Sequence, residues 1–182
     1  MRRIVEGSAT AFRALVTEYY PLAYSLAYRV VGDAGEAEEV AQDAFLRVHA
    51  AMPSFRGEAS LKTWILRIVH RLSLNRRRDR SRTAWHRLGL AHSGDVDLVP
   101  PPPSREPDPE TELISRQTRE QVMEAVDGLS APLRDVVMLS SMGELTYEEI
   151  ARVLGVPMGT VSSRLHAARR QLADELGRRE LI

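Results

Sequence analysis

The stretch from Thr146 to Arg170 constrains the fold of this chain most, because it predicts two helices separated by a glycine turn. The Thr146 hydroxyl can cap the first helix while Glu149 reaches back to the Thr146 amide, which is the pattern of a capping box. Gly155 has the backbone freedom to end that helix and turn the chain. Pro157 suits the first position of the second helix, where its missing amide hydrogen has no partner to lose. The sequence therefore predicts a helix-turn-helix.

The second of these helices has two unlike faces. At about 100° per residue, one stripe is apolar and comprises Val161, Leu165, Ala168 and Leu172. The opposite side is small and polar at its start and basic at its end, as a recognition helix requires, because its first residues approach base edges and later arginines bind phosphates. An ordinary helical hairpin with a solvated basic face is the alternative, which the coinciding cap, glycine turn and arginine pair disfavour. The candidate contacts to duplex DNA are Gly159, Thr160, Ser162, Ser163, Arg164, His166, Arg169 and Arg170.

The charges of the chain are segregated along the sequence. Its 182 residues contain 25 basic and 25 acidic side chains, a net charge of zero that is unexpected for a DNA-binding protein. Residues 33–43, however, contain acids and no base, whereas residues 67–87 are rich in arginine and contain one acid, Asp79. We therefore expect one surface to bind a basic partner and another to bind a polyanion.

Several classes of protein are disfavoured by what the sequence does not contain. There is no cysteine, so disulfides and thiolate metal sites are excluded, and no apolar run is long enough for a membrane span or a signal peptide. The five histidines have no ligand-like spacing, and no phosphate-cradling loop or nucleophile elbow is present. We expect a cytoplasmic protein that is not an enzyme, with no membrane insertion, catalytic residue, metal, cofactor or small-molecule substrate.

The middle of the chain separates two helical regions. Residues 93–110 contain few large apolar side chains and a run of prolines from Pro100 to Pro103, so this segment cannot bury enough surface to fold. We therefore predict an all-α protein in which two small helical domains are joined by a flexible Pro-rich linker. The predicted boundaries are 1–85 for the first domain, 86–110 for the linker and 111–182 for the helix-turn-helix domain.

The first domain is predicted to contain helices throughout, with Pro21 restarting the chain into a second helix and Asp33 capping a third. On the third, one side is apolar and comprises Ala37, Val40, Ala41, Ala44 and Val48. The other side comprises Glu39, Gln42, Asp43 and Leu46. An apolar residue in an acidic surround suits a protein contact, although a lone exposed leucine is common on any surface.

A fourth helix is predicted after Ser60, which can cap it. Its expected core side comprises Leu61, Trp64, Ile65, Ile68 and Leu72, and its expected outward side comprises Thr63, Arg67, His70, Leu74 and Arg77. A basic face beside a loop that contains Phe55 and Gly57 suits capture of single-stranded DNA, where phosphates contact arginines and an unstacked base contacts a ring. A solvated helix end is the alternative for the arginines, but so many adjacent positive charges favour an anionic partner.

Together these segments resemble an extracytoplasmic-function sigma factor of the sigma-70 superfamily. Residues Glu36–Val48 are similar to the family's core-polymerase-binding helix, and Phe55–Ile68 are similar to its promoter-melting segment. Residues Leu129–Leu139 and the helix-turn-helix that follows are similar to its C-terminal domain. The segments occur in the family's order and cover nearly the whole chain.

The resemblance implies partners and roles beyond those argued from the residues. It assigns Glu39, Gln42, Asp43 and Leu46 to core RNA polymerase, and the recognition helix to the −35 element of promoter DNA as duplex. It implies that the −10 element is bound as a melted strand, with a base flipped near Phe55. The residues assigned to the −10 element are Phe55, Arg56, Gly57, Glu58, Thr63, Arg67, His70, Arg76, Arg77 and Arg78. The family is commonly held inactive by an anti-sigma factor, so such a partner is expected.

Two other functions remain open at the level of sequence. A stand-alone helix-turn-helix transcriptional regulator would bind duplex operator unaided, usually as a symmetric dimer on two half-sites. A helical adaptor that binds only proteins would leave the two basic faces unexplained. The sequence also departs from the family pattern, with Arg71 and Asn75 on the melting helix where Asn and Asp are common, and Ser162 in the recognition helix where Lys is common.

Overall fold

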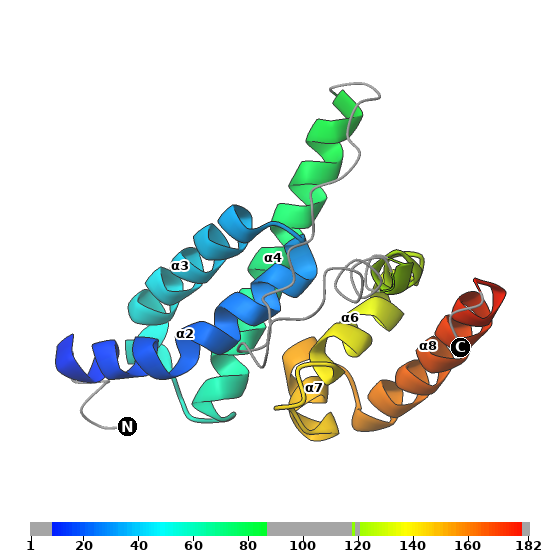
Figure 1. The fold of residues 1–182 in the computed structure, drawn as a ribbon. Coiled ribbons are helices and arrows are strands. Elements are labelled where there is room, and N and C mark those ends of the chain that lie inside the picture. Colours follow the sequence, from blue (N-terminus) through cyan, green and yellow to red (C-terminus); the bar gives the residue numbers. More distant parts are fainter. Residues whose placement is uncertain (1–8, 87–117, 119–120, 180–182) are drawn as a thin grey trace, which may run out of the picture. The chain divides into compact units, whose positions relative to one another are not determined.

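In the computed structural model, the described residues are 9–86, 118 and 121–179, and every regular element among them is helical. The chain divides into two compact units. The first contains α2 (Ala9–Val31), α3 (Ala34–Ala51), the 3₁₀ turn η1 (Met52–Ser54) and α4 (Leu61–His86), as Figure 1 shows. The second contains a helix over 121–127, α6 (Ala131–Ser140), the first part of α7 (Tyr147–Leu154) and α8 (Met158–Arg178). The prediction of an all-α fold with two helical domains is confirmed.

The linker predicted over 86–110 lies outside the described residues, except that His86 is the last residue of α4. Within the described ranges, no helix is both long enough and apolar enough to cross a membrane.

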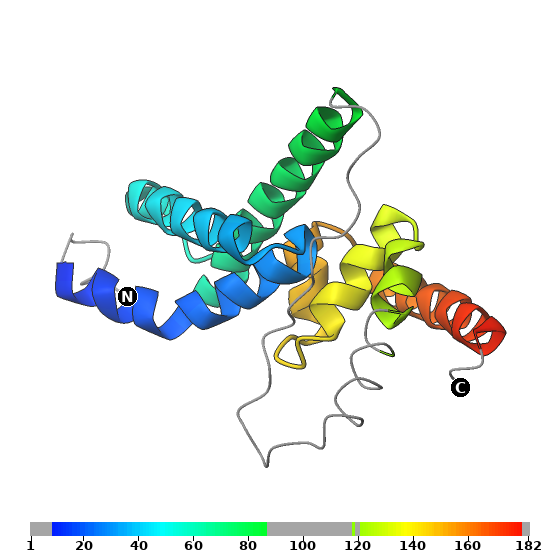
Figure 2. The same ribbon diagram turned by 45° about the horizontal axis from the view of Figure 1, so that its top comes forward.

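The first unit is a bundle in which α2, α3 and α4 all pack against one another. Its core includes Leu26 of α2, Val48 of α3, and Ile65 and Val69 of α4, all buried. The C-terminal part of α4 extends past the ends of α2 and α3, as Figures 1 and 2 show.

Local side-chain caps fix where α3 and α4 begin. Asp33 Oδ1 accepts the backbone N–H of Glu36 at 2.8 Å, and Ser60 Oγ accepts the backbone N–H of Thr63 at 3.1 Å. Each bond satisfies an amide that has no partner within its own helix. Both predicted caps are therefore confirmed.

The prediction that Pro21 begins a new helix is wrong, because α2 continues through it from Ala9 to Val31. Pro21 is exposed, so the carbonyl that loses its intrahelical hydrogen bond can bond to water. Leu15 before the proline and Leu26 after it are both buried in the bundle. Tertiary packing on both sides of Pro21 thus keeps the two halves in one helix.

In the second unit, α6 packs against α8, and the core includes Val136, Leu139, Ile150 and Val161. Arg134 of α6 donates from Nε to the Val126 carbonyl at 3.2 Å and from Nη2 to the Leu129 carbonyl at 2.9 Å. This guanidinium adds donors to carbonyls at and just after the end of the helix over 121–127, where few partners remain within the helix. Arg134 therefore ties α6 to the end of that helix.

The turn between α7 and α8 follows the predicted design with one difference. The Thr146 N–H donates to Glu149 Oε2 at 2.9 Å and the Glu149 N–H donates to Thr146 Oγ1 at 3.2 Å, so the capping box is confirmed. Gly155 has a φ of 68°, the left-handed conformation that glycine adopts readily. Pro157, however, is extended with ψ at 148° and precedes the helix, which begins at Met158. The chain leaves the glycine turn extended, so Pro157 is one residue too early to be helical.

Candidate nucleic-acid and protein interfaces

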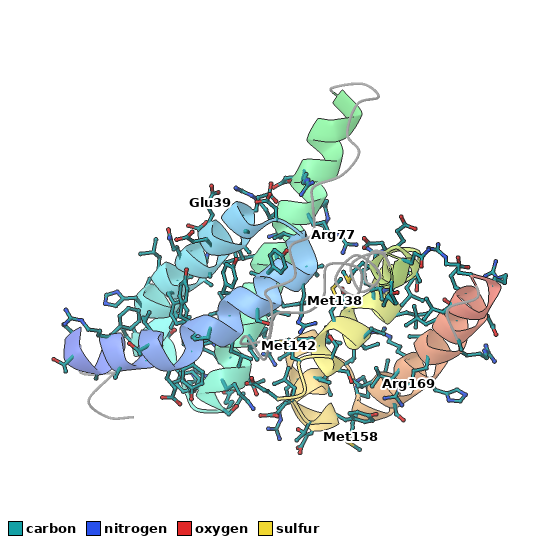
Figure 3. The ribbon with its side chains drawn as sticks, in the orientation of Figure 1. Glu39, Arg77, Met138, Met142, Met158 and Arg169 are labelled. Carbon is teal, nitrogen blue, oxygen red and sulfur yellow. The ribbon has the colours of Figure 1, made fainter. Side chains whose placement is uncertain are left out.

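The two faces of α8 are separated as predicted. Of the predicted apolar stripe, Val161, Leu165 and Ala168 are buried, and Leu172 is half-buried. The exposed residues of the opposite face are Gly159, Ser162, Ser163, His166, Arg169 and Arg170. Thr160 and Arg164 are half-buried at its border. The helix therefore presents small side chains near its start and two arginines further along, and Figure 3 shows Arg169 projecting from α8.

Gly159 lies in the first turn of α8, where the fold does not require a glycine. It is exposed, and a Cβ built on it would meet nothing within 4 Å. A glycine in a helix interior costs about 1 kcal/mol relative to alanine. A position that accepts this cost without a steric reason inside the protein suits close approach of the backbone to a ligand from outside.

The arginines on this face are available to a ligand. Arg169 and Arg170 form no ion pair with any side chain in the described part of the chain. Both side chains are exposed at the surface of α8. Unpaired arginines next to a small, polar helix start are the arrangement that binds a phosphate backbone while the helix enters the major groove.

The predicted polymerase face lies on α3. The five apolar residues predicted for the inner side, Ala37, Val40, Ala41, Ala44 and Val48, are all buried. Glu39, Gln42, Asp43 and Leu46 are all exposed on the other side, and Leu46 is 70% exposed. An apolar side chain of this size exposed among acids is the kind of central contact that interfaces with proteins use.

Leu46 also lines an apolar groove between α2 and α3, with a volume of about 580 Å³. Rings form much of its wall, because Tyr20 stacks on Phe45 at 6.0 Å between centroids, and Phe12 meets His49 edge-on at 4.7 Å. Gln42 and Leu46 belong both to this groove and to the exposed face of α3. The candidate protein interface is therefore continuous with an apolar hollow.

The loop between η1 and α4 carries the second predicted DNA contact. Phe55 and Trp64 lie with their ring centroids 4.7 Å apart and their planes tilted by 40°. Both are half-buried, so the assignment of Trp64 to core packing is only partly right. Gly57 has a φ of 72°, and Arg56, Gly57 and Glu58 are exposed. The loop thus places an accessible aromatic pair beside a charged turn, which suits stacking of an unpaired base.

Two residues predicted to face outward on α4 do not. Thr63 is 0% exposed and His70 is 7% exposed, so neither is presented for DNA contact. Thr63 is held by Ser60, whose Oγ lies 2.8 Å from Thr63 Oγ1. Because α4 packs against both α2 and α3, its buried arc is wider than one apolar stripe and includes these positions. Arg67 is exposed on the same helix, as predicted.

The arginines of α4 lie close to acids of α3. Arg76 forms an ion pair with Glu39, and Arg80 lies 3.9 Å from Glu36. Arg80 also donates from Nη1 to the Val31 carbonyl at 3.4 Å. In Figure 3, Glu39 on α3 and Arg77 on α4 lie at the same end of the first unit. Residues assigned to different partners are therefore brought side by side by the fold.

Comparison with known proteins identifies the family. The family model Sigma-70 region 2 matches residues 15–83, and the model Sigma-70, region 4 matches residues 119–172. The chain is 30% identical to the ECF RNA polymerase sigma-E factor of Escherichia coli K12, with 97% of this chain and 92% of that protein covered. This chain belongs to the ECF sigma factors.

Other relatives agree with this assignment. ECF RNA polymerase sigma factor SigW of Bacillus subtilis is 28% identical, with 97% of this sigma factor and 94% of that one covered. The sigma factor RpoE of Bartonella quintana, solved in complex with the anti-sigma factor NepR, shares its fold with a TM-score of 0.70. That similarity, at 22% identity, covers 93% of this chain and 98% of the other.

Sequence reasoning missed the α2 side of the groove in this sigma factor. Phe12, Val16 and Tyr20 line it, and they recur every four residues on one stripe of α2. That periodicity was visible, but it is equally typical of residues packed in a core. Only the position of α2 against α3 shows that this stripe borders Leu46. Among the described residues, no cluster of histidine and acidic side chains is arranged to hold a metal ion.

Proposed function

We propose that this chain is an alternative sigma factor that binds core RNA polymerase and directs promoter-specific initiation of transcription. It recognises the −10 element as a melted strand and the −35 element as duplex. The observation that carries the proposal is that the chain matches two sigma-factor regions in order, and that each region exposes a different surface. One is the acidic face of α3 around Leu46 and the other is the small and basic face of α8.

In this proposal, three surfaces each bind a different partner. Glu39, Gln42, Asp43 and Leu46 bind the polymerase, through acids that complement a basic partner and a leucine that fills a pocket. The melted −10 strand contacts the loop and α4, through Phe55, Arg56, Gly57, Glu58, Arg67, Arg76, Arg77 and Arg78. The duplex −35 element contacts α8, through Gly159, Thr160, Ser162, Ser163, Arg164, His166, Arg169 and Arg170. Thr63 and His70 are left out because they are buried.

Sigma factors initiate transcription without being enzymes, and we propose that all catalysis belongs to the polymerase. The chain acts in the cytoplasm, where its polymerase and promoter are. Its functional domains are residues 1–85 and 111–182, joined by the segment 86–110.

We propose an anti-sigma factor as the regulatory partner of this chain. The Bartonella quintana relative is bound to such a factor, and a second solved relative, CnrH, is in complex with the cytosolic domain of CnrY. A protein that covers the acidic face of α3 would block polymerase binding directly.

The test is open-complex formation on a labelled promoter with purified core RNA polymerase. The proposal predicts that core and chain together melt a specific promoter, whereas either alone does not. A stand-alone regulator would instead bind a duplex operator by itself and gain nothing from core polymerase. Specific duplex binding that is unchanged by core polymerase, without strand opening, would contradict the proposal.

The same assay can test which side chains of α8 contact bases and which contact the DNA backbone. Ser163→Ala or His166→Ala should change which −35 sequence is preferred, because these side chains lie among the first exposed residues of the helix. Each lost base contact is worth about 1–3 kcal/mol of discrimination. A uniform loss on all promoters, with preference unchanged, would show that these side chains contact only the DNA backbone.

A further inference from the structure

The first unit contains one ion pair that joins two surfaces with different proposed partners. Glu39 belongs to the polymerase face of α3, and Arg76 belongs to the −10 DNA face of α4. The guanidinium of Arg76 donates from Nη2 to Glu39 Oε2. In the free chain, therefore, a residue assigned to DNA is bound to a residue assigned to the polymerase.

Neighbouring contacts hold the two helices in this register. Arg80 lies one turn beyond Arg76 on α4 and contacts both Glu36 of α3 and the carbonyl of Val31. The cap from Asp33 to the Glu36 amide fixes the first turn of α3. The Arg76–Glu39 pair is thus set by the packing of α3 on α4.

Both members of the pair remain accessible to other ligands. The side chain of Arg76 is 42% exposed and that of Glu39 is 64% exposed. A DNA phosphate that approached Arg76 would compete with the Glu39 carboxylate for the same N–H donors and would be repelled by its charge. A basic residue of a partner protein that approached Glu39 would compete with Arg76 in the same way.

We propose that the Glu39–Arg76 pair couples polymerase binding to −10 strand binding. In the free chain, Glu39 masks Arg76 and weakens contact with single-stranded DNA. When polymerase engages Glu39, Arg76 is released to bind phosphate, so each partner favours the other. This coupling rests on the proposed function, because it needs both partners, and linkage requires that it act equally in both directions.

The masking is tested in the free, full-length chain with fluorescein-labelled oligodeoxythymidine at low ionic strength. Glu39→Gln should tighten binding about two- to fivefold, the range expected for an exposed ion pair. Arg76→Gln should weaken binding, and Glu39→Gln should have little further effect in the Arg76→Gln background. The double-mutant cycle separates the interaction between Glu39 and Arg76 from the effect of removing a single charge. When the cycle is measured in a chain that also carries Arg169→Gln and Arg170→Gln, the contribution of α8 to DNA binding is removed.

Glu38→Gln is the matched control, because it removes one negative charge from the adjacent position of the same helix. Glu38 accepts a hydrogen bond from Gln42 Nε2 at 3.1 Å. Burial and then the charge of Glu38 raise the pKa of Tyr20, so this carboxylate lies near α2. The effect of Glu38→Gln on DNA affinity should be small, and it should be equal with and without the Arg76→Gln substitution. Circular dichroism and thermal unfolding check that every variant is folded.

The coupling is tested with core polymerase and a promoter fragment whose −10 region is single-stranded. Arg76→Gln should cost several-fold more affinity in the complex than in the free chain, and Glu39→Gln should no longer tighten DNA binding there. The masking of Arg76 by Glu39 is overturned if Glu39→Gln weakens oligodeoxythymidine binding. It is also overturned if Glu39→Gln has the same effect with Arg76 present as with Arg76→Gln. Coupling is overturned if the Arg76→Gln penalty is the same with and without polymerase. A chain that does not bind polymerase at all refutes the proposed function, while the free-chain cycle still reports on the ion pair.

Discussion

The arginines of the two units differ in what surrounds them. Arg76 and Arg80 of α4 lie against acids of α3, whereas Arg169 and Arg170 of α8 are exposed and have no ion-pair partner among the described residues. Arg76, Arg169 and Arg170 are proposed to bind promoter DNA. Arg76 is therefore partly occupied by a carboxylate, whereas Arg169 and Arg170 have no such partner in the part of the chain that the structure describes.

Arginine content alone therefore does not measure affinity for DNA. A phosphate that binds the face of α8 replaces only water and counterions, so this contact is driven by counterion release. A phosphate that binds Arg76 must also displace a carboxylate. We infer that the second unit is ready for duplex DNA in the free chain, whereas the first unit becomes fully competent with polymerase.

The largest effect should come from Leu46→Asp, which places a charge at the centre of the α3 face. Leu46 is 70% exposed, so the free chain should fold normally, but affinity for core polymerase should fall by about 2 kcal/mol or more, roughly thirtyfold. Competition binding with labelled core enzyme measures this loss. Ala14→Asp, on an exposed position of α2 outside the groove, is the charge-matched control. If duplex DNA binding by α8 falls equally, the variant is unfolded and the comparison between units fails.

Arg169→Gln with Arg170→Gln should come next. Loss of two unpaired phosphate contacts should weaken binding to every duplex by on the order of tenfold at low salt and reduce the salt slope by about two. Arg76→Gln should cost the free chain much less, because its charge is already partly neutralised by Glu39. Titration with duplexes of different sequence over a range of salt concentrations provides the measurement. Equal losses from α4 and α8 variants would remove the contrast between the two units.

Gly159→Ala should move stability and binding in opposite directions. Alanine should stabilise α8 by about 1 kcal/mol, since a Cβ at this position meets nothing within 4 Å. The same methyl group should weaken −35 binding several-fold if the backbone approaches DNA closely here. Thermal unfolding and duplex titration of the same preparation give both values. Unchanged binding by a stabilised protein would place Gly159 away from the DNA.

The smallest effect should be a pH dependence at the C-terminal end of α8. The hydrogen bond from Arg179, and then the charge of Arg178, lower the pKa of Glu175 below its ordinary value of 4.5. A lowered pKa contributes stability above the unfolded value, and this is lost as pH falls through the folded value. Arg179 also pairs with Glu124 at 2.8 Å, which ties α8 to the helix over 121–127.

Glu175→Gln should therefore destabilise the second unit slightly at neutral pH, and by less as the pH falls below 4.5 and through the lowered pKa of the wild-type carboxylate. Thermal unfolding across this range measures the difference from wild type. Asp174→Asn, an exposed neighbour, controls for loss of charge. A difference that does not shrink on acidification would mean that the ion pair does not stabilise the fold.

Features set by neighbouring residues could be predicted from the sequence. Asp33, Ser60 and Thr146 cap helices because their partners lie three residues away, and Gly155 turns the chain through its own backbone. The two faces of α3 and of α8 also follow from helical periodicity. The fold class and most of the exposed candidate residues could therefore be predicted from local sequence patterns.

Features set by packing could not be predicted in the same way. Pro21 stays helical because both flanks of α2 are buried, and Thr63 and His70 are covered because α4 contacts two helices. Glu39 and Arg76 are 37 residues apart, and no periodicity indicates that they pair.

Association with core RNA polymerase is the most direct test of the account. Fluorescence anisotropy of the labelled full-length chain, titrated with purified core enzyme at low salt, should show saturable binding of one chain per enzyme. Excess unlabelled wild-type chain should displace it, and the Leu46→Asp variant should compete poorly. Absence of saturable binding, or equal competition by Leu46→Asp, would contradict the account.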